Sequence, residues 1–148
     1  MTTVINTALL REIKDETNDC TVRAVSAATG LTYLNAHGLA KLAGRHSKKG
    51  FWTDKILREA KANGILDYTK SYMFDMAKLT KSIKSGWGKI SHGSPYPTLA
   101  QVLPLLSKGR FILETRKHAL AVVDGVVYDQ GSKLKARYRV VTIFEVKI

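Results

Sequence analysis

Apolar runs rich in β-branched residues, separated by short polar turns, follow one another along the last third of the chain, as in consecutive β-strands. Two β-branched runs, at 119–123 and 126–128, flank the dipeptide Asp124-Gly125. Such a dipeptide between two apolar runs is the strongest local signal for a hairpin, because both turn residues tolerate positive φ. The sequence therefore predicts a hairpin with a two-residue turn at this point. Its ladder would pair four sets of residues: Val123 with Val126, Val122 with Val127, Ala121 with Tyr128, and Leu120 with Asp129.

Helical spacing dominates the first half of the chain. The run from Cys20 to Gly30 places small apolar residues on one stripe, and Asn18-Asp19 in front of it can cap a helix. Gly30 stands where a helix C-terminus is expected. Further helices are predicted over 33–43, from 53 to about 63, over 75–84 and over 99–106, the last interrupted by Pro104. A loop is predicted over 86–97, and strands over 65–68, 110–115, 118–123, 126–129 and 137–146.

The order of these elements predicts the fold class. Helices come first and most strands follow, which is typical of an α+β protein whose helices pack on one face of a sheet. A chain of 148 residues is also long enough to bury its own core. We expect a single α+β domain over residues 1–148, with N-terminal helices packed on a C-terminal antiparallel β-sheet.

Cysteine content and hydropathy indicate a compartment. The chain has one cysteine, so it cannot form an internal disulfide, and this fits a reducing environment. No apolar run approaches membrane-spanning length, and the N-terminus lacks the basic start and long apolar stretch of a signal peptide. We therefore expect a cytoplasmic protein that does not associate with a membrane.

The net charge of +12 is the unusual bulk property of this sequence. An excess of this size favours an acidic partner, such as nucleic acid, an anionic surface or an acidic protein. The alternative is that the lysines are solvated helix faces that keep the protein soluble. No recognition-helix signature, zinc-finger spacing or aromatic RNA-binding motif accompanies the charge. Charge alone therefore does not identify a nucleic-acid-binding protein. The sequence also leaves the oligomeric state open.

Cys20, His118 and Asp129 together are the strongest candidates for chemistry. Cys20 opens a predicted helix, where free N–H groups and the helix dipole stabilise a thiolate and could hold an oxyanion. His118 and Asp129 are diagonal neighbours on one face of the predicted hairpin, with Cβ atoms roughly 7–8 Å apart. Cys20 would act as nucleophile and His118 as general base and later acid, while Asp129 would fix the tautomer and orientation of the imidazole.

Structural roles for the same residue types are the alternative. A lone intracellular cysteine is more often a small buried apolar residue, and a single histidine in a strand is usually structural. The other histidines, His37, His46 and His92, are weaker candidates, and the aromatic residues Trp52, Trp87 and Tyr96 fit packing better than a cofactor site, although Trp87 or Tyr96 could line a substrate groove. The sequence has no metal-ligand spacing, phosphate-binding loop or Ser-centred elbow, so we expect no metal and no cofactor.

Two segments resemble a known family. NDCTVRAVSAATG, in which Asn-Asp-Cys opens a helix, and GRFILETRKHALAVVDGVVYD are similar to papain-like cysteine peptidases, nearest to small bacteriocin-peptidase-like domains found in bacteriophage genomes. The resemblance covers residues 17–33 and 98–129. It implies a papain-like fold, a viral protein in the host cytoplasm, and a triad of Cys20, His118 and Asp129. The implied reaction is cleavage of a peptide, isopeptide or related amide or thioester bond.

One departure from the family pattern bears on activity. The family usually carries a glutamine several residues before the cysteine as an oxyanion donor, whereas residues 14–19 here read KDETND. Asn18 is the candidate substitute for this oxyanion donor. The alternative function is a catalytically inactive papain-like fold that uses its basic surface to bind a host protein or nucleic acid.

Overall fold

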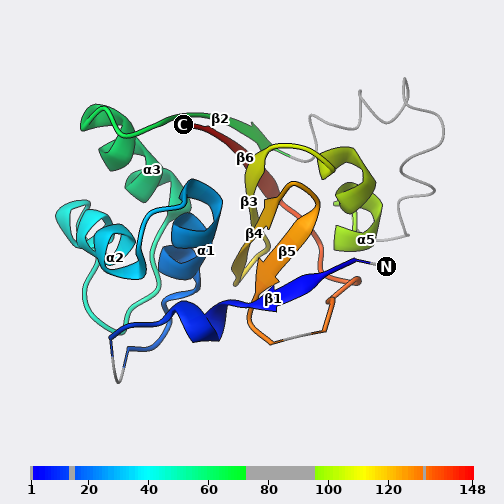
Figure 1. The fold of residues 1–148 in the computed structure, drawn as a ribbon, viewed down its shortest axis with the longest axis horizontal. Helices are drawn as coiled ribbons and strands as arrows, with labels where there is room; N and C mark the ends of the chain where they lie inside the picture. Colours follow the sequence, from blue (N-terminus) through cyan, green and yellow to red (C-terminus); the bar gives the residue numbers. More distant parts are fainter. Residues whose placement is uncertain (1, 14–15, 73–95, 132) are drawn as a thin grey trace.

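A computed structural model describes residues 2–13, 16–72, 96–131 and 133–148. The helix expected over 75–84 and most of the loop expected over 86–97 lie outside these residues, as do Trp87 and His92. The elements of the described chain, drawn in Figure 1, follow in this order: β1 (Val4–Asn6), the 3-10 helix η1 (Thr7–Leu10), α1 (Cys20–Thr29), α2 (Tyr33–Leu42), α3 (Thr53–Ala62), β2 (Asp67–Tyr72), α5 (Leu99–Val102), the 3-10 helix η2 (Leu103–Leu106), β3 (Arg110–Glu114), β4 (Ala119–Val123), β5 (Val126–Asp129) and β6 (Thr142–Lys147).

The strands form one mixed sheet in the order β1-β5-β4-β3-β6-β2. β1 runs parallel to β5, and the other neighbouring strands are antiparallel. The α+β class is confirmed, but the expectation of a purely antiparallel, C-terminal sheet is wrong. An N-terminal strand forms one edge, and a strand from the middle of the chain forms the other. The sequence did not reveal β1, because three residues are too few to show strand alternation.

The hairpin predicted around Asp124-Gly125 is confirmed. Asp124 and Gly125 have φ values of 49° and 82°, as a tight turn between twisted strands requires. The turn is also tied to the start of β3, because the N–H of Gly109 donates to Oδ1 of Asp124 at 2.9 Å. The ladder between β4 and β5 has the expected register: Ala121 with Tyr128, Val122 with Val127, and Val123 with Val126.

Helices cover both faces of the sheet, which corrects the expectation that they cover one. In Figure 1, α1, α2 and α3 lie on one side of the strands and α5 lies on the other. Successive residues of a strand point to opposite faces, so the fully buried Ile112 and Leu113 of β3 need a cover on each side. Ile112 packs with α1, α2 and α3, while Leu113 packs with α5 and η2. The sheet is therefore buried between two helical layers.

Some of the predicted helix and strand boundaries agree with the structure, and others differ from it. The C-cap of α1 is Gly30 in the left-handed region, and Thr32 and Thr98 cap α2 and α5 through their side chains. The helix interrupted by Pro104 is short, because α-helical geometry ends at Val102 and a 3-10 turn follows. The strands expected over 65–68 and 137–146 instead span Asp67–Tyr72 and Thr142–Lys147. Within the described ranges, no helix has the length and apolar character needed to cross a bilayer.

Candidate active site

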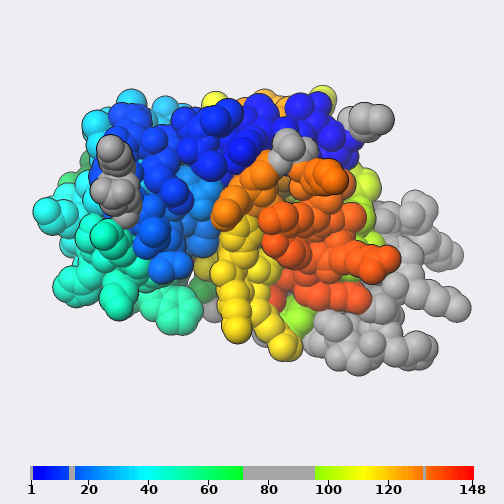
Figure 2. All heavy atoms as spheres, turned by 90° about the horizontal axis from the view of Figure 1, so that it is seen from below, coloured from blue at the N-terminus to red at the C-terminus, as the bar shows by residue number. Residues whose placement is uncertain are grey.

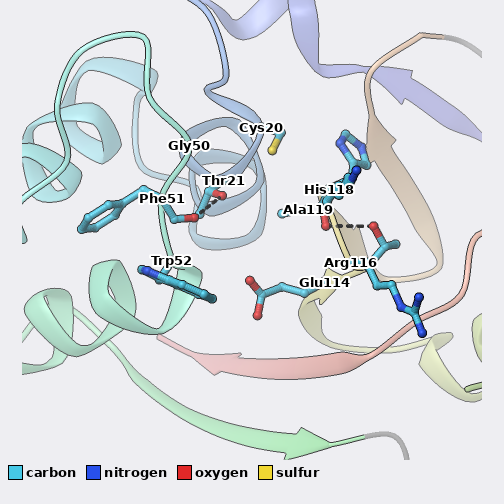
Figure 3. A pocket seen from close by; sticks show the side chains of 11 residues that line it. Cys20, Thr21, Gly50, Phe51, Trp52, Glu114, Arg116, His118 and Ala119 are labelled. Atoms are coloured by element: carbon cyan, nitrogen blue, oxygen red, sulfur yellow. Dashed lines mark hydrogen bonds between the residues drawn. The ribbon is translucent and has the colours of Figure 1, made fainter.

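Cys20, His118 and Asp129 are brought together at one end of the sheet. Cys20 is the first residue of α1, His118 directly precedes β4, and Asp129 is the last residue of β5. α1 packs against β4, and β4 is hydrogen-bonded to β5, so the three elements are direct neighbours. Figure 3 shows Cys20 and His118 facing the same hollow. The three candidates chosen from sequence therefore converge, although 98 residues separate the cysteine from the histidine.

The imidazole of His118 is fixed by two neighbours. Its Nε2 hydrogen-bonds to Oδ1 of Asp129, and the N–H of Gln130 donates to the same carboxylate oxygen at 2.7 Å. The ring of Tyr138 meets the imidazole edge-on, with centroids 5.7 Å apart. Asp129 is buried, and its Oδ2 has no hydrogen-bond partner among the residues that the structure describes. These contacts set the ring plane and leave Nδ1 of His118 for the thiol of Cys20.

The charges of Cys20 and His118 support each other. Burial alone would raise the pKa of the Cys20 thiol, but hydrogen bonds from His118 and from the backbone of Ala119 outweigh burial and lower it. Burial alone would lower the pKa of His118, but Asp129 and the Cys20 thiolate raise it to about 9. The hydrogen bond between the two side chains therefore favours the charged form of each, a thiolate beside an imidazolium.

Asp19, the residue before Cys20, is held by a buried ionic cluster. The carboxylate of Asp19 accepts hydrogen bonds from Arg11 at 2.6 Å, Arg23 at 3.0 Å and the Tyr33 hydroxyl at 2.7 Å. Burial alone would raise the pKa of Asp19, yet these partners hold that pKa at about 2. The sequence predicted that Asp19 would cap α1 with its side chain, and that prediction is wrong. Charged donors form stronger hydrogen bonds than neutral backbone N–H groups, so the carboxylate turns inward toward the arginines.

A second buried carboxylate fixes the segment in front of α1. Glu16 accepts hydrogen bonds from the guanidinium of Arg45 at 3.1 Å and from the N–H of Lys48 at 2.7 Å, and it contacts His37 at 2.7 Å. Burial alone would raise the pKa of Glu16, but Arg45 and His37 hold it at about 2. His37 therefore has a structural partner. The ion pair between Glu16 and Arg45 joins the segment in front of Cys20 to the loop after α2.

Asn18, the candidate oxyanion donor, lies apart from the hollow that holds Cys20. Its side-chain amide donates to the carbonyl of Lys48 at 3.0 Å, and its backbone adopts a φ of 52°. The residues that line the hollow do not include Asn18. The backbone offers another donor, because the first intrahelical bond of α1 runs from the N–H of Arg23 to the carbonyl of Asp19. The N–H groups of Cys20 and the next two residues come before that bond and so need partners outside the helix.

The thiol opens into a hollow of about 320 Å³. One wall comes from the start of α1 and the segment 50–52, and the other comes from residues 114–119. Figure 2 shows these two parts of the chain, blue to green-cyan and yellow, on opposite sides of a furrow in the surface. A hollow between an N-terminal and a C-terminal wall can receive an extended chain beside the thiol.

Sequence reasoning missed three residues of this site. Trp52 and Glu114 line the hollow, and Tyr138 packs against His118. Trp52 was interpreted as a packing residue, yet 67% of its surface is exposed. Glu114 carries a signal that could have been used, because it is a carboxylate at the end of an apolar strand run. Tyr138 has no local signal, since its partner is twenty residues away in a different element.

In the part of the chain that the structure describes, no group of three or more His, Cys, Asp or Glu side chains is arranged to hold a metal ion. Comparisons with protein-family models, with curated proteins and with solved structures found no match.

Proposed function

We propose that this protein is a papain-like cysteine hydrolase that cleaves a peptide, isopeptide or related amide or thioester bond. The observation that supports this most strongly is the contact chain from the Cys20 thiol through the imidazole of His118 to the carboxylate of Asp129. The lone cysteine lies at a helix N-terminus, and its histidine partner is oriented by a buried carboxylate. A structural cysteine needs neither arrangement.

Each residue would have one task in the reaction. The Cys20 thiolate attacks the carbonyl carbon, and the electron pair of the C=O bond moves to oxygen, where N–H groups at the start of α1 can stabilise it. The His118 imidazolium then gives its proton to the leaving amine or thiol as the acyl group stays on sulfur. Neutral His118 next takes a proton from water as the water oxygen attacks the thioester, and the C–S bond then breaks, which releases the acid and restores the Cys20 thiolate beside the His118 imidazolium. Asp129 keeps the imidazole oriented and stabilises its charged form throughout.

The test is the rate of Cys20 alkylation by iodoacetamide as a function of pH. The chain has one cysteine, so labelling reports on this residue alone. We expect reactivity to persist well below pH 8.5, the ordinary pKa of a thiol, and to be lost at low pH in His118→Ala. His46→Ala, at an exposed histidine outside the hollow, is the matched control and should label like the unmodified protein. Labelling that follows an ordinary thiol titration would overturn the proposal.

The net charge of +12 supports a second candidate, a binding protein for nucleic acid or an acidic protein on the same fold. This function would survive Cys20→Ala, whereas hydrolysis would not. A mixed-sequence DNA duplex and a single-stranded RNA are suitable probes. An affinity that falls steeply between 50 and 200 mM salt would favour the second candidate. An affinity too weak to measure at 50 mM salt would remove it.

A further inference from the structure

Trp52 and Glu114 lie between two hollows. They line the hollow that contains Cys20, and both also line an adjacent hollow of about 330 Å³ whose other residues come from α3, β2 and β6. Figure 3 shows the carboxylate of Glu114 extending toward the indole ring of Trp52. A substrate that reaches the thiol along this groove would therefore place one side chain between the ring and the carboxylate.

We propose that Trp52 and Glu114 form a subsite for a cationic side chain, lysine or arginine, next to the bond that is cleaved. This inference rests on the proposed hydrolase function and adds a substrate class to it. A cation in this position would contact the face of the indole and the carboxylate together, and the two attractions reinforce each other in a partly buried site. Trp52 is 67% exposed, so the ring is open to such a contact.

Glu114 is the carboxylate in this groove that can accept further hydrogen bonds. Its Oε2 accepts one hydrogen bond from the Thr53 hydroxyl at 3.2 Å, and an ionised carboxylate can accept several. Burial raises the pKa of Glu114 despite the nearby charge of Lys70, so the surrounding charge does not fully offset the cost of burial. Asp54, which lines the adjacent hollow, is already paired with Arg58 at 3.0 Å and with the Tyr68 hydroxyl at 2.9 Å.

The basic residues of the hollow lie elsewhere and do not fill this subsite. Arg116 and Lys117 line the hollow from the turn between β3 and β4. In Figure 3 the side chain of Arg116 extends away from Glu114. The adjacent hollow also carries three basic residues, and each has a partner: Lys55 lies over the Phe51 ring at 5.7 Å, and Arg58 and Lys70 pair with Asp54 at 3.0 and 3.6 Å. Within the hollow that contains Cys20, Glu114 is the acidic residue near Trp52, and the two basic residues lie at the turn. A substrate cation would be attracted to Glu114, and this polarity would also set the direction in which a peptide lies.

A structural role for Glu114 is the alternative. The carboxylate is bonded to Thr53, the first residue of α3, and so helps to hold the start of that helix. Glu114→Gln separates the two roles, because a glutamine carbonyl still accepts from Thr53 but carries no charge. A purely structural Glu114 would leave substrate preference unchanged in this variant.

The experiment compares two affinity labels, acetyl-lysyl chloromethyl ketone and its uncharged counterpart acetyl-norleucyl chloromethyl ketone, at the Cys20 thiol. We expect the lysyl label to react about tenfold faster, the size of effect that one well-placed charge contact gives. Glu114→Gln should abolish the preference, and Trp52→Ala, at an exposed position, should reduce it. Glu145→Gln, at a carboxylate that lines neither hollow, is the matched control and should retain it.

A second measurement makes the result independent of catalysis. Acetyl-lysine methylamide should shift the indole N–H resonance of Trp52 by NMR, and the norleucine compound should do so much more weakly. Equal labelling rates with normal low-pH iodoacetamide reactivity would overturn this subsite and leave the hydrolase proposal standing. An ordinary thiol titration together with a lysine-selective indole shift would instead overturn the hydrolase and leave the cation subsite. The absence of both effects would overturn the subsite and the hydrolase together.

Discussion

Nε2 of His118 hydrogen-bonds to Oδ1 of Asp129 across the hairpin that Asp124 and Gly125 close. His118 directly precedes β4 and Asp129 ends the neighbouring strand β5, so one local turn sets the distance between them. Because the carboxylate holds Nε2, the other ring nitrogen is left for Cys20. The orientation of His118 thus follows from strand register, and the approach of Cys20 follows from the packing of α1 on β4.

Asp129→Asn should lower the pKa of His118. That pKa is raised to about 9, in part by the negative charge of Asp129, and asparagine keeps a similar shape without the charge. We expect a fall of at least about one unit, measured from the imidazole resonances by NMR. Under the proposed hydrolysis, turnover should then begin to fall at a lower pH on the alkaline side than in the unmodified protein, because the imidazolium would supply the proton to the leaving group. An unchanged His118 titration would show that Asp129 does not set this pKa.

The same His118 shift has a consequence for stability. The pKa in the folded protein, about 9, lies above the ordinary value of 6.5, so the charged form stabilises the fold. This contribution is fully present below pH 6.5 and is lost as the pH rises through about 9. Asp129→Asn should reduce the slope of the unfolding free energy between these pH values. Urea denaturation at pH 6, 7.5 and 9 measures that slope.

Asp19→Asn should destabilise the protein strongly. The change leaves the guanidiniums of Arg11 and Arg23 without their shared carboxylate, and Arg23 is buried with 4% of its side chain exposed. Breaking a buried ion pair from one side costs about 3–5 kcal/mol. Asp67→Asn is the control, because Asp67 pairs with Lys61 at the surface, where solvent screens the pair and its loss should change stability much less. Equal costs from urea denaturation would contradict the structural role of the Asp19 cluster.

Acid should unfold the protein through Glu16 and Asp19. Both carboxylates have a pKa of about 2 in the folded protein, below their ordinary values of 4.5 and 3.8. A depressed pKa gives stability that is present above the ordinary value and is lost as the pH falls toward 2. The unfolding free energy should therefore decrease steeply from pH 5 to pH 2. Glu16→Gln should flatten the decrease above pH 3, and an unchanged profile would show that Glu16 does not contribute to it.

Two glycine-to-alanine changes should alter stability in opposite directions. Gly125 has a φ of 82°, which L-residues rarely adopt, so Gly125→Ala should cost about 1 kcal/mol. Gly38 lies within α2, and an added Cβ there would meet nothing within 4 Å. Gly38→Ala should therefore stabilise the protein by about 0.5–1 kcal/mol through helix propensity. Thermal melting measures both, and changes of the same sign would contradict this account.

The hairpin shows how much of the site local sequence can determine. Asp124-Gly125 specifies the turn, the turn specifies the register, and the register places His118 beside Asp129. Each step depends on residues close together in the chain, and for that reason it could be predicted. The helix start at Cys20 was predictable in the same way, although the cap at Asp19 was not.

Asp19 differs because its partners are distant in sequence. Whether its carboxylate caps a helix or binds arginine depends on Arg11 and Tyr33 arriving from other elements. The exposed Trp52 and the half-buried Glu114 likewise become neighbours only when α3 packs near the end of β3. Strand β1 is too short to be predicted from the sequence, and only its pairing with β5 identifies it as a strand.

The sequence by itself determined the α+β class, the hairpin and the three residues at the centre of the proposed chemistry. Tertiary structure alone decided that the sheet is mixed and covered on both faces, that Asp19 turns inward, and that Trp52 and Glu114 line the same hollow. The physical reason is the distance along the sequence over which each interaction acts. Turn geometry, helix start signals and strand alternation act over a few residues, whereas burial and charge pairing depend on which distant segments the folded chain brings into contact.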